Sequence, residues 1–121
     1  MTQKQPFNIK HSDDFDRDGK WFLARRSLDI TSFGMNLVEL APEESIPEHT
    51  EVGSDQEEVF IILEGTPDVI IDGEAHPTKP GTYVRLNPEP KRTIKNNGKE
   101  KALVLIVSAP RTSGYKPLDW A

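Results

Sequence analysis

Residues 46–65 read IPEHTEVGSDQEEVFIILEG, and this stretch decides how the rest of the chain folds. Its second half contains an uninterrupted apolar run, residues 59–63, bounded by turn-forming residues and by Gly65. A run of this length and composition suits a buried strand better than a helix. Because side chains alternate between the faces of a strand, Glu58, Phe60 and Ile62 share one face, and Val59, Ile61 and Leu63 share the other. The Glu58 carboxyl is therefore predicted to lie among apolar neighbours.

Short strands are predicted on both sides of this stretch, between turns rich in Gly and Pro. They cover residues 21–25, 35–40, 68–71, 82–86, 92–96 and 103–107. Asp72-Gly73 and Asn97-Gly98 are predicted hairpin turns, because Asn, Asp and Gly accept the positive φ angles that such turns need. No segment of helical length shows a sustained 3.6-residue period. The fold class is therefore all-β, an antiparallel barrel or sandwich without a long helix.

The chain divides into a polar N-terminal arm (1–20), a β-barrel (21–108) and a C-terminal tail (109–121) that is expected to pack on the barrel or on a partner subunit. At 121 residues, the chain is long enough to form a stable core without disulfides or structural metal ions. The absence of cysteine excludes disulfides and thiolate metal sites. A net charge of −5 without a basic block argues against a nucleic-acid surface. No apolar run spans a membrane and no signal peptide is evident, so a cytoplasmic protein is expected.

Two short motifs lie between residues 46 and 98. The first has His49 and then Glu58, with Gly65 seven residues later; the second has Gly73, Pro80-Gly81 and Asn96. In these positions the chain resembles the cupin family of small β-barrels. The resemblance implies a jelly-roll (double-stranded β-helix) fold and a site inside the barrel.

The resemblance also implies a metal site, but the ligand set is incomplete. In cupins, two histidines, a glutamate and a third histidine converge on one divalent metal, which imidazole and carboxylate ligands suit. Here Glu51 stands where the second histidine would fall, and Arg92 where the third would fall. An arginine keeps its proton and repels a cation. The predicted pocket is therefore poor in metal ligands.

The predicted pocket residues are His49, Glu58, Phe60, Arg92 and Ile94. Glu58 and Arg92 both fall on strand faces that they share with apolar residues, and inward charges need partners. They are expected to point into the barrel near its open end, with His49 at the rim. Two interpretations follow: a structural ion pair in an inert barrel, or a pocket in which Arg92 receives an anionic group of a small molecule. His11 and His76 are interpreted as solvated.

Three functions remain open at this stage. The first is binding of a small anionic or polar molecule in a metal-poor pocket. The second is a metal-dependent enzyme, an isomerase or dioxygenase, in which His49, Glu51 and Glu58 hold Fe, Mn, Zn or Ni. The third is a non-catalytic dimeric module that serves a partner protein.

A homodimer is expected in each case. Residues 59–63 and 103–107 are apolar on both faces, and a closed barrel buries only the inner one. A partner subunit would cover the outer face. Within one chain, the arm with Trp21 or the tail with Tyr115 and Trp120 could cover it instead.

Overall fold

The computed structural model describes residues 5–121, which form nine strands and two short helices. The strands are β1 (Arg17–Asp18), β2 (Trp21–Phe22), β3 (Gly34–Leu40), β4 (Gln56–Glu64), β5 (Asp68–Ile71), β6 (Glu74–Pro77), β7 (Tyr83–Leu86), β8 (Arg92–Lys95) and β9 (Ala102–Pro110). The helices are a 3₁₀ turn, η1 (Ser12–Asp14), and α1 (Ala24–Leu28). No helix in this part of the chain is both long and apolar enough to span a membrane.

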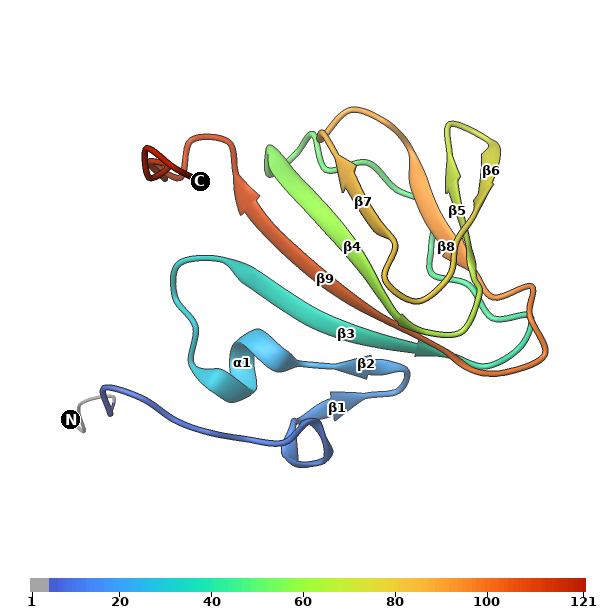
Figure 1. The fold of residues 1–121 in the computed structure, drawn as a ribbon, viewed down its shortest axis with the longest axis horizontal. Coiled ribbons are helices and arrows are strands. Elements are labelled where there is room, and N and C mark those ends of the chain that lie inside the picture. The colour runs from blue at the N-terminus through green and yellow to red at the C-terminus, as the bar shows by residue number, and fades with distance from the viewer. Residues whose placement is uncertain (1–4) are drawn as a thin grey trace.

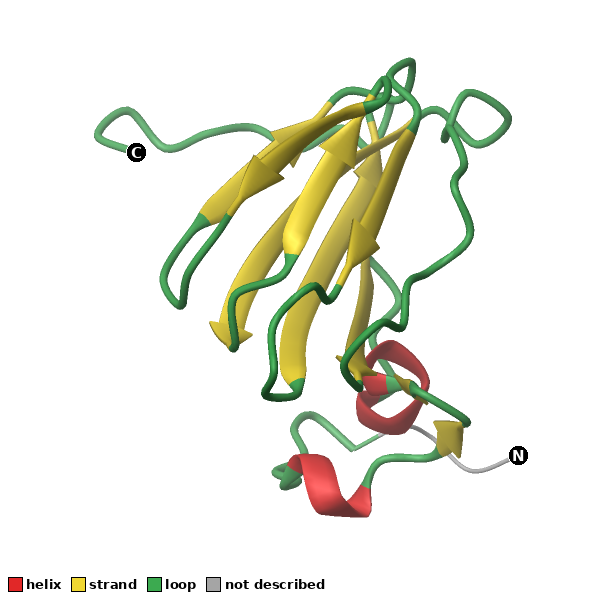
Figure 2. Cartoon of the chain, turned by 90° about the vertical axis from the view of Figure 1, so that its right-hand side faces the viewer, coloured by secondary structure: helices red, strands yellow, loops and turns green. Residues whose placement is uncertain are grey.

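The strands form two antiparallel sheets that enclose the core (Figures 1 and 2). The larger sheet has the order β1-β2-β3-β9-β4-β7, and the smaller has the order β6-β5-β8. The last strand, β9, lies between β3 and β4, so the chain ends by crossing back into the middle of the larger sheet. This mostly β, antiparallel architecture confirms the predicted all-β jelly roll.

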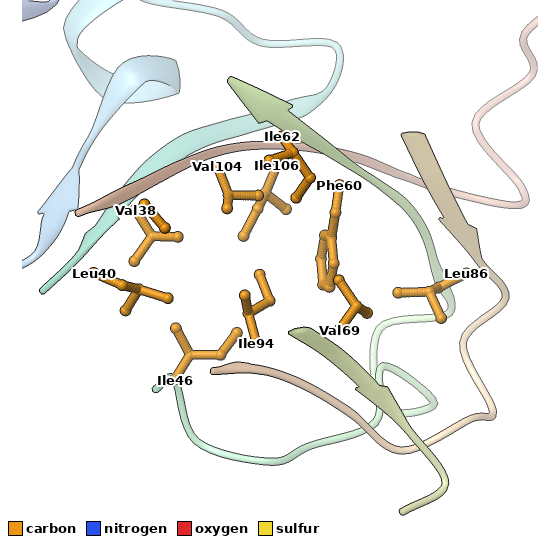
Figure 3. Close-up of a cluster of buried hydrophobic side chains, with 11 residues drawn as sticks. Val38, Leu40, Ile46, Phe60, Ile62, Val69, Leu86, Ile94, Val104 and Ile106 are labelled. Carbon is orange, nitrogen blue, oxygen red and sulfur yellow. The ribbon is translucent and has the colours of Figure 1, made fainter. Parts of the chain in front are cut away.

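The core lies between the two sheets (Figure 3). Strand β4 shows the predicted alternation: Glu58, Phe60 and Ile62 are buried, whereas Val59 and Ile61 are only half-buried. Both sheets contribute to the core cluster, which comprises Val38, Leu40, Ile46, Phe60, Ile62, Val69, Leu86, Ile94, Ala102, Val104 and Ile106. Full burial of one large apolar side chain contributes about 1.5–3 kcal/mol, so this cluster is the main source of stability.

The predicted hairpin at Asp72-Gly73 is confirmed. Strands β5 and β6 pair directly across it, and the two turn residues have φ angles of 48° and 82°. These positive values at both positions are what a two-residue hairpin turn requires.

The loop before β4 is more ordered than its prolines suggest. Its backbone pairs with the free edge of β8: the Ile46 N–H donates to the Ile94 carbonyl at 3.2 Å, and His49 and Arg92 exchange two hydrogen bonds of 3.1 and 2.9 Å. This segment contains Pro42 and Pro47, for which a loop was predicted. The pairing fixes the His49 backbone directly beside Arg92.

The prediction of a strand over residues 21–25 is wrong in its second half. Only Trp21 and Phe22 are extended, and α1 begins at Ala24. Ala24 and Ser27 lie three residues apart and are buried on one side of this helix, while Arg25 and Arg26 remain exposed. A single helical turn is too short for its period to be recognised in the sequence.

The predicted hairpin at Asn97-Gly98 is also wrong. Strand β8 pairs with β5 and β9 pairs with β3 and β4, so the connection crosses between the sheets. The buried Asn96 amide holds it in place by donating to the carbonyls of Leu40 (2.9 Å) and Glu100 (2.8 Å), and its side-chain oxygen accepts from the Gly98 N–H (3.0 Å). A side chain, and not backbone pairing, thus closes this turn.

The described part of the arm and the C-terminal tail lie outside the barrel. The first four residues of the predicted arm are outside the described residues, and the rest of the arm includes η1 and β1, which pairs with β2. Beyond β9, residues 111–121 are exposed throughout, and the tail extends away from the sheets (Figures 1 and 2). The expected packing of the tail on its own barrel is therefore not seen.

Candidate functional site

A cavity of about 240 Å³ opens between the larger sheet and the loop before β4. Strands β2, β3, β4 and β9 and residues 46–51 supply its walls. The lining residues are Trp21, Gly34, Met35, Asn36, Ile46, His49, Glu51, Glu58, Phe60, Ile106 and Ser108. The walls are thus mainly apolar, with three titratable side chains on one side.

Those three side chains are His49, Glu51 and Glu58, and each offers a ligand atom within 4.8 Å of the others. His49 Nε2 lies 3.0 Å from Glu51 Oε1, and His49 Nδ1 lies 2.8 Å from the Pro47 carbonyl oxygen. A carbonyl can only accept, so it fixes a proton on Nδ1 and leaves Nε2 to face Glu51. The ring is thereby held with its Nε2 atom on the cluster.

Glu58 is the most buried member of the cluster. It is 7% exposed, and its Oε1 atom has no hydrogen-bond partner. Burial raises the pKa of its carboxyl above the ordinary value of 4.5, and the nearby Glu51 carboxylate raises it further, against smaller lowering effects from Arg92 and His49. Glu58 therefore takes up a proton more readily than an exposed glutamate does.

Arg92 lies behind Glu58 and does not line the cavity. Its side chain is fully buried; Nη1 donates to the Pro88 carbonyl at 3.1 Å, and Nη2 donates to the Asn87 carbonyl. Its Nε atom lies 3.6 Å from Glu58 Oε1, which makes an ion pair without a hydrogen bond. The expectation that Glu58 and Arg92 point inward and pair is thus met, but Arg92 is not placed to contact a molecule in the cavity.

The predicted pocket set is only partly brought together. His49, Glu58 and Phe60 line the cavity, whereas Arg92 and Ile94 lie in the interior behind it. Glu51, assigned from the sequence only to the metal set, lines the cavity as well. Parity along the strands predicts which side chains face inward, but not how far along the barrel the cavity extends.

Sequence reasoning missed the wall formed by β2, β3 and β9, including Trp21 and Ser108. Gly34 gave a usable signal, since a glycine at the start of an apolar strand often marks a close backbone approach. A Cβ at Gly34 would lie 2.6 Å from Ser108 Oγ. The missing side chain therefore leaves room for the Ser108 hydroxyl at this wall.

The cavity carries acidic character. Its lining contains two carboxyl groups and one imidazole, and no lysine or arginine. An anion entering it would meet the Glu51 and Glu58 carboxyl groups beside a single imidazole, because the permanent charge of Arg92 is sealed in the interior. The arrangement suits groups that donate hydrogen bonds or carry positive charge.

The cupin domain family matches residues 36–108, a span that runs from within β3 to within β9 and includes most of the cavity-lining residues. The chain belongs to the cupin family. Among curated proteins, none matches this sequence. The family assignment agrees with the expected resemblance, and this small cupin keeps the barrel while changing two of the four metal-ligand positions.

Solved structures of cupins share the fold. A cupin protein from Bacteroides fragilis is 21% identical with a TM-score of 0.78, over 95% of this chain and 93% of that chain. The plu4264 protein from Photorhabdus luminescens is 18% identical with a TM-score of 0.67, over 91% and 92%. A cupin-superfamily sugar phosphate isomerase from Silicibacter pomeroyi is 22% identical with a TM-score of 0.65, over 74% of this chain and 57% of that chain. At these identities, the likeness shows the fold alone.

The remaining donor set still fits a divalent metal. His49, Glu51 and Glu58 give one imidazole nitrogen and two carboxylate oxygens, the donor types that first-row divalent ions accept. The Glu58 Oε1 atom is buried and lacks a hydrogen-bond partner, and Nδ1 of His49 is already held by the Pro47 carbonyl. Three protein ligands would leave open positions for a substrate, as in catalytic metal sites.

Proposed function

We propose that this cupin binds a small polar molecule directly in the cavity. The observation that supports it is the convergence of His49, Glu51 and Glu58 on one side of a chamber whose other walls are mostly apolar. Small-molecule sites combine apolar walls with a few convergent polar groups in this way. The apolar walls hold the body of the ligand, and the three polar groups orient it.

The cavity limits the size of the ligand. The volume of the cavity is about 240 Å³. This is below the usual range of about 300–1,000 Å³ for ligand pockets. The fitting ligand is therefore a compact molecule.

The charges of the lining favour a neutral or positively charged ligand over an anion. Glu51 can accept hydrogen bonds from a ligand hydroxyl or amine, and a protonated Glu58 can donate to a ligand oxygen. The Arg92 charge acts on the Glu58 carboxyl from the interior side of the barrel, and Arg92 does not contact the ligand itself. Of the two ligand classes considered from the sequence, the polar one retains support.

Ligand binding can be followed by the fluorescence of Trp21, because this side chain lines the cavity. The chain has two tryptophans, so a Trp120→Phe background leaves Trp21 as the single reporter. Compact polyols, hydroxy acids and amines are titrated while Trp21 fluorescence and the melting temperature are followed. A neutral or cationic compound is expected to bind, and Glu58→Gln is expected to weaken it at least tenfold.

His76→Gln is the matched control, because His76 is exposed on β6 and lies outside the cavity lining. It is expected to leave binding unchanged. Tight binding of anions only, or ligand binding that Glu58→Gln does not affect, would overturn the proposed site.

A second candidate, a metal-dependent enzyme, is supported by the fit of the three donors and the unpaired Glu58 oxygen. When bound, Fe, Mn, Zn or Ni would polarise a ligand oxygen as a Lewis acid. His49 and Glu51 would hold the ion at the rim and Glu58 from the interior. The buried Arg92 charge beside Glu58 opposes this binding.

Calorimetric titration of Zn²⁺ or Ni²⁺ separates the two candidates. Stoichiometric binding by the wild type that Glu58→Gln abolishes would support the metal site. If only Arg92→His binds the ion, the permanent charge of Arg92 is what weakens the site, and direct ligand binding is favoured. No binding in either protein would refute the metal candidate.

A further inference from the structure

A second hollow, the outer cleft, adjoins the cavity where β3 and β4 begin and β9 ends (Figure 1). Its volume is about 590 Å³, and it shares Gly34 and Ser108 with the cavity lining. Gln56 lines the outer cleft and Glu58 lines the cavity, so the two hollows follow each other along one face of β4, about 7 Å apart. The outer cleft is lined by Arg25, Ile30, Thr31, Ser32, Phe33, Gly34, Ser54, Gln56, Ser108 and Pro110.

The outer cleft and the cavity differ in the sign of their charge. The described lining of the outer cleft contains one arginine and no aspartate or glutamate, whereas the cavity lining contains two carboxyl groups and no lysine or arginine. Asp55, which lies between two lining residues in the sequence, already pairs with Arg111 at 2.6 Å. The other polar groups of the outer cleft are hydroxyls and an amide, which can donate to an anion; they belong to Thr31, Ser32, Ser54, Gln56 and Ser108.

Arg25 differs from every other arginine of the chain in having no acidic partner. The others each form an ion pair with a carboxylate; they are Arg17, Arg26, Arg85, Arg92 and Arg111. Arg25 forms none with the residues that the structure describes, and its Nη1 atom donates only to the Ile30 carbonyl, at 3.0 Å. Because Ile30 also lines the outer cleft, this bond holds the guanidinium at the wall. A guanidinium has five N–H donors, so most of them remain for a ligand.

We propose that Arg25 binds a carboxylate at one end of the ligand while the cavity holds an amine or hydroxyl at the other end, which rests on the function proposed above for the cavity. The ligand class is then a bipolar small molecule, an amino acid or a hydroxy acid whose two groups lie about 7 Å apart. The sequence assigned the anionic group to Arg92, which is buried behind Glu58. Arg25 supplies an exposed positive charge in its place.

A carboxylate fits the outer cleft better than a phosphate does. A single guanidinium matches the one negative charge and the planar shape of a carboxylate with two parallel hydrogen bonds. A phosphate group carries a charge of about −1.5 to −2, which one arginine does not neutralise, and the carboxyl groups of Glu51 and Glu58 lie in the adjoining cavity. Arg25 belongs to α1, outside the span that matches the cupin family, so this contact is not implied by the family match.

Paired ligands test the proposal by Trp21 fluorescence in the Trp120→Phe background. The probes are ω-amino acids and ω-hydroxy acids of about four to six carbons, which span about 7 Å, and each is compared with its carboxamide, which keeps the shape and lacks the negative charge. The variants are Arg25→Gln, which removes the charge, and Arg25→Lys, which keeps it. Arg26→Gln is the matched control, because Arg26 is the next residue of α1, is exposed and lies outside both linings.

The wild type is expected to bind a carboxylate probe about fivefold more tightly than its carboxamide, since the ion pair is exposed. Arg25→Gln should abolish this preference without changing the affinity for the carboxamide, whereas Arg25→Lys and Arg26→Gln should retain most of it. Added salt should weaken binding of the carboxylate probe only.

Equal binding of the two probes by the wild type overturns the role of Arg25. An equal loss of preference in Arg25→Gln and Arg26→Gln overturns it as well, because a general effect of net charge would then explain the preference. In both cases carboxamide binding that Glu58→Gln weakens leaves the function proposed for the cavity intact. If neither carboxamides nor amines bind, the proposed function fails, and the assignment of Arg25 fails with it.

Discussion

The buried pair of Glu58 and Arg92 makes the sharpest prediction. The two side chains are 9% and 0% exposed, and Nε of Arg92 lies 3.6 Å from Oε1 of Glu58. Without Arg92, the Glu58 carboxyl can become neutral by taking up a proton. Without Glu58, Arg92 stays charged, because a guanidinium keeps its proton in a protein. Removing the glutamate should therefore cost more stability at pH 5 than removing the arginine.

Breaking a buried pair on one side costs about 3–5 kcal/mol when the charge left behind is uncompensated. We expect Glu58→Gln to lower the unfolding free energy by about 3 kcal/mol, since an amide oxygen still faces Arg92. Arg92→Met should cost about 2 kcal/mol at pH 5, about 1 kcal/mol for each lost hydrogen bond to Asn87 and Pro88. The double variant should also cost about 2 kcal/mol, so the single effects do not add.

The pH dependence has a defined sign. The pKa of Glu58 is raised in the folded state, so the stability that it contributes is complete below pH 4.5 and is lost as the pH rises through the folded pKa. Arg92 lowers that pKa, so Arg92→Met raises it further and extends the loss to higher pH. Glu58→Gln abolishes this titration.

Urea unfolding at pH 5 and pH 8, followed by circular dichroism, measures the unfolding free energies of the wild type, Glu58→Gln, Arg92→Met and the double variant. The Arg92→Met variant should lose more stability than the wild type between the two pH values. Additive single effects within about 0.5 kcal/mol would refute the coupling of the pair. Equal pH dependence in Arg92→Met and the wild type would refute the electrostatic role of Arg92.

Four further substitutions test the barrel itself, each by urea or thermal unfolding. Gly65→Ala should lower the unfolding free energy by more than about 2 kcal/mol, because φ is 80° and the new Cβ would lie 2.6 Å from the Lys101 carbonyl oxygen. Gly73→Ala, where φ is 82° and the space around the new Cβ is open, should cost only about 1–2 kcal/mol. Equal costs for the two substitutions would contradict the steric argument. Phe60→Ala should cost about 3–5 kcal/mol, and a loss below about 1 kcal/mol would mean that Phe60 is not part of the packed core. Asn96→Ala should cost about 2–3 kcal/mol by removing the donor to the buried Leu40 carbonyl and to the part-buried Glu100 carbonyl, and a neutral effect would contradict its role in the crossover.

The sequence by itself determined the fold class and the inward faces. Period-two alternation identified Glu58, Phe60 and Ile62 as one buried face, and Arg92, Ile94 and Asn96 as another. Such patterns are local, because burial of one strand face imposes them on every second residue. The Asp72-Gly73 turn was predictable for the same reason, since its φ angles depend on two adjacent residues.

The tertiary structure decided which of these residues share a cavity. Trp21, Gly34 and Ser108 reach the site from strands far apart in the sequence, and no local pattern relates them. It also decided that Asn97-Gly98 crosses between sheets, because the Asn96 amide donates to the carbonyl of Leu40, 56 residues away in the sequence. Arg92 shows the distinction most clearly. Alternation along the strand predicts that its side chain points inward. The hydrogen bonds to the carbonyls of Asn87 and Pro88, which form only in the packed barrel, hold the guanidinium behind Glu58 and outside the cavity.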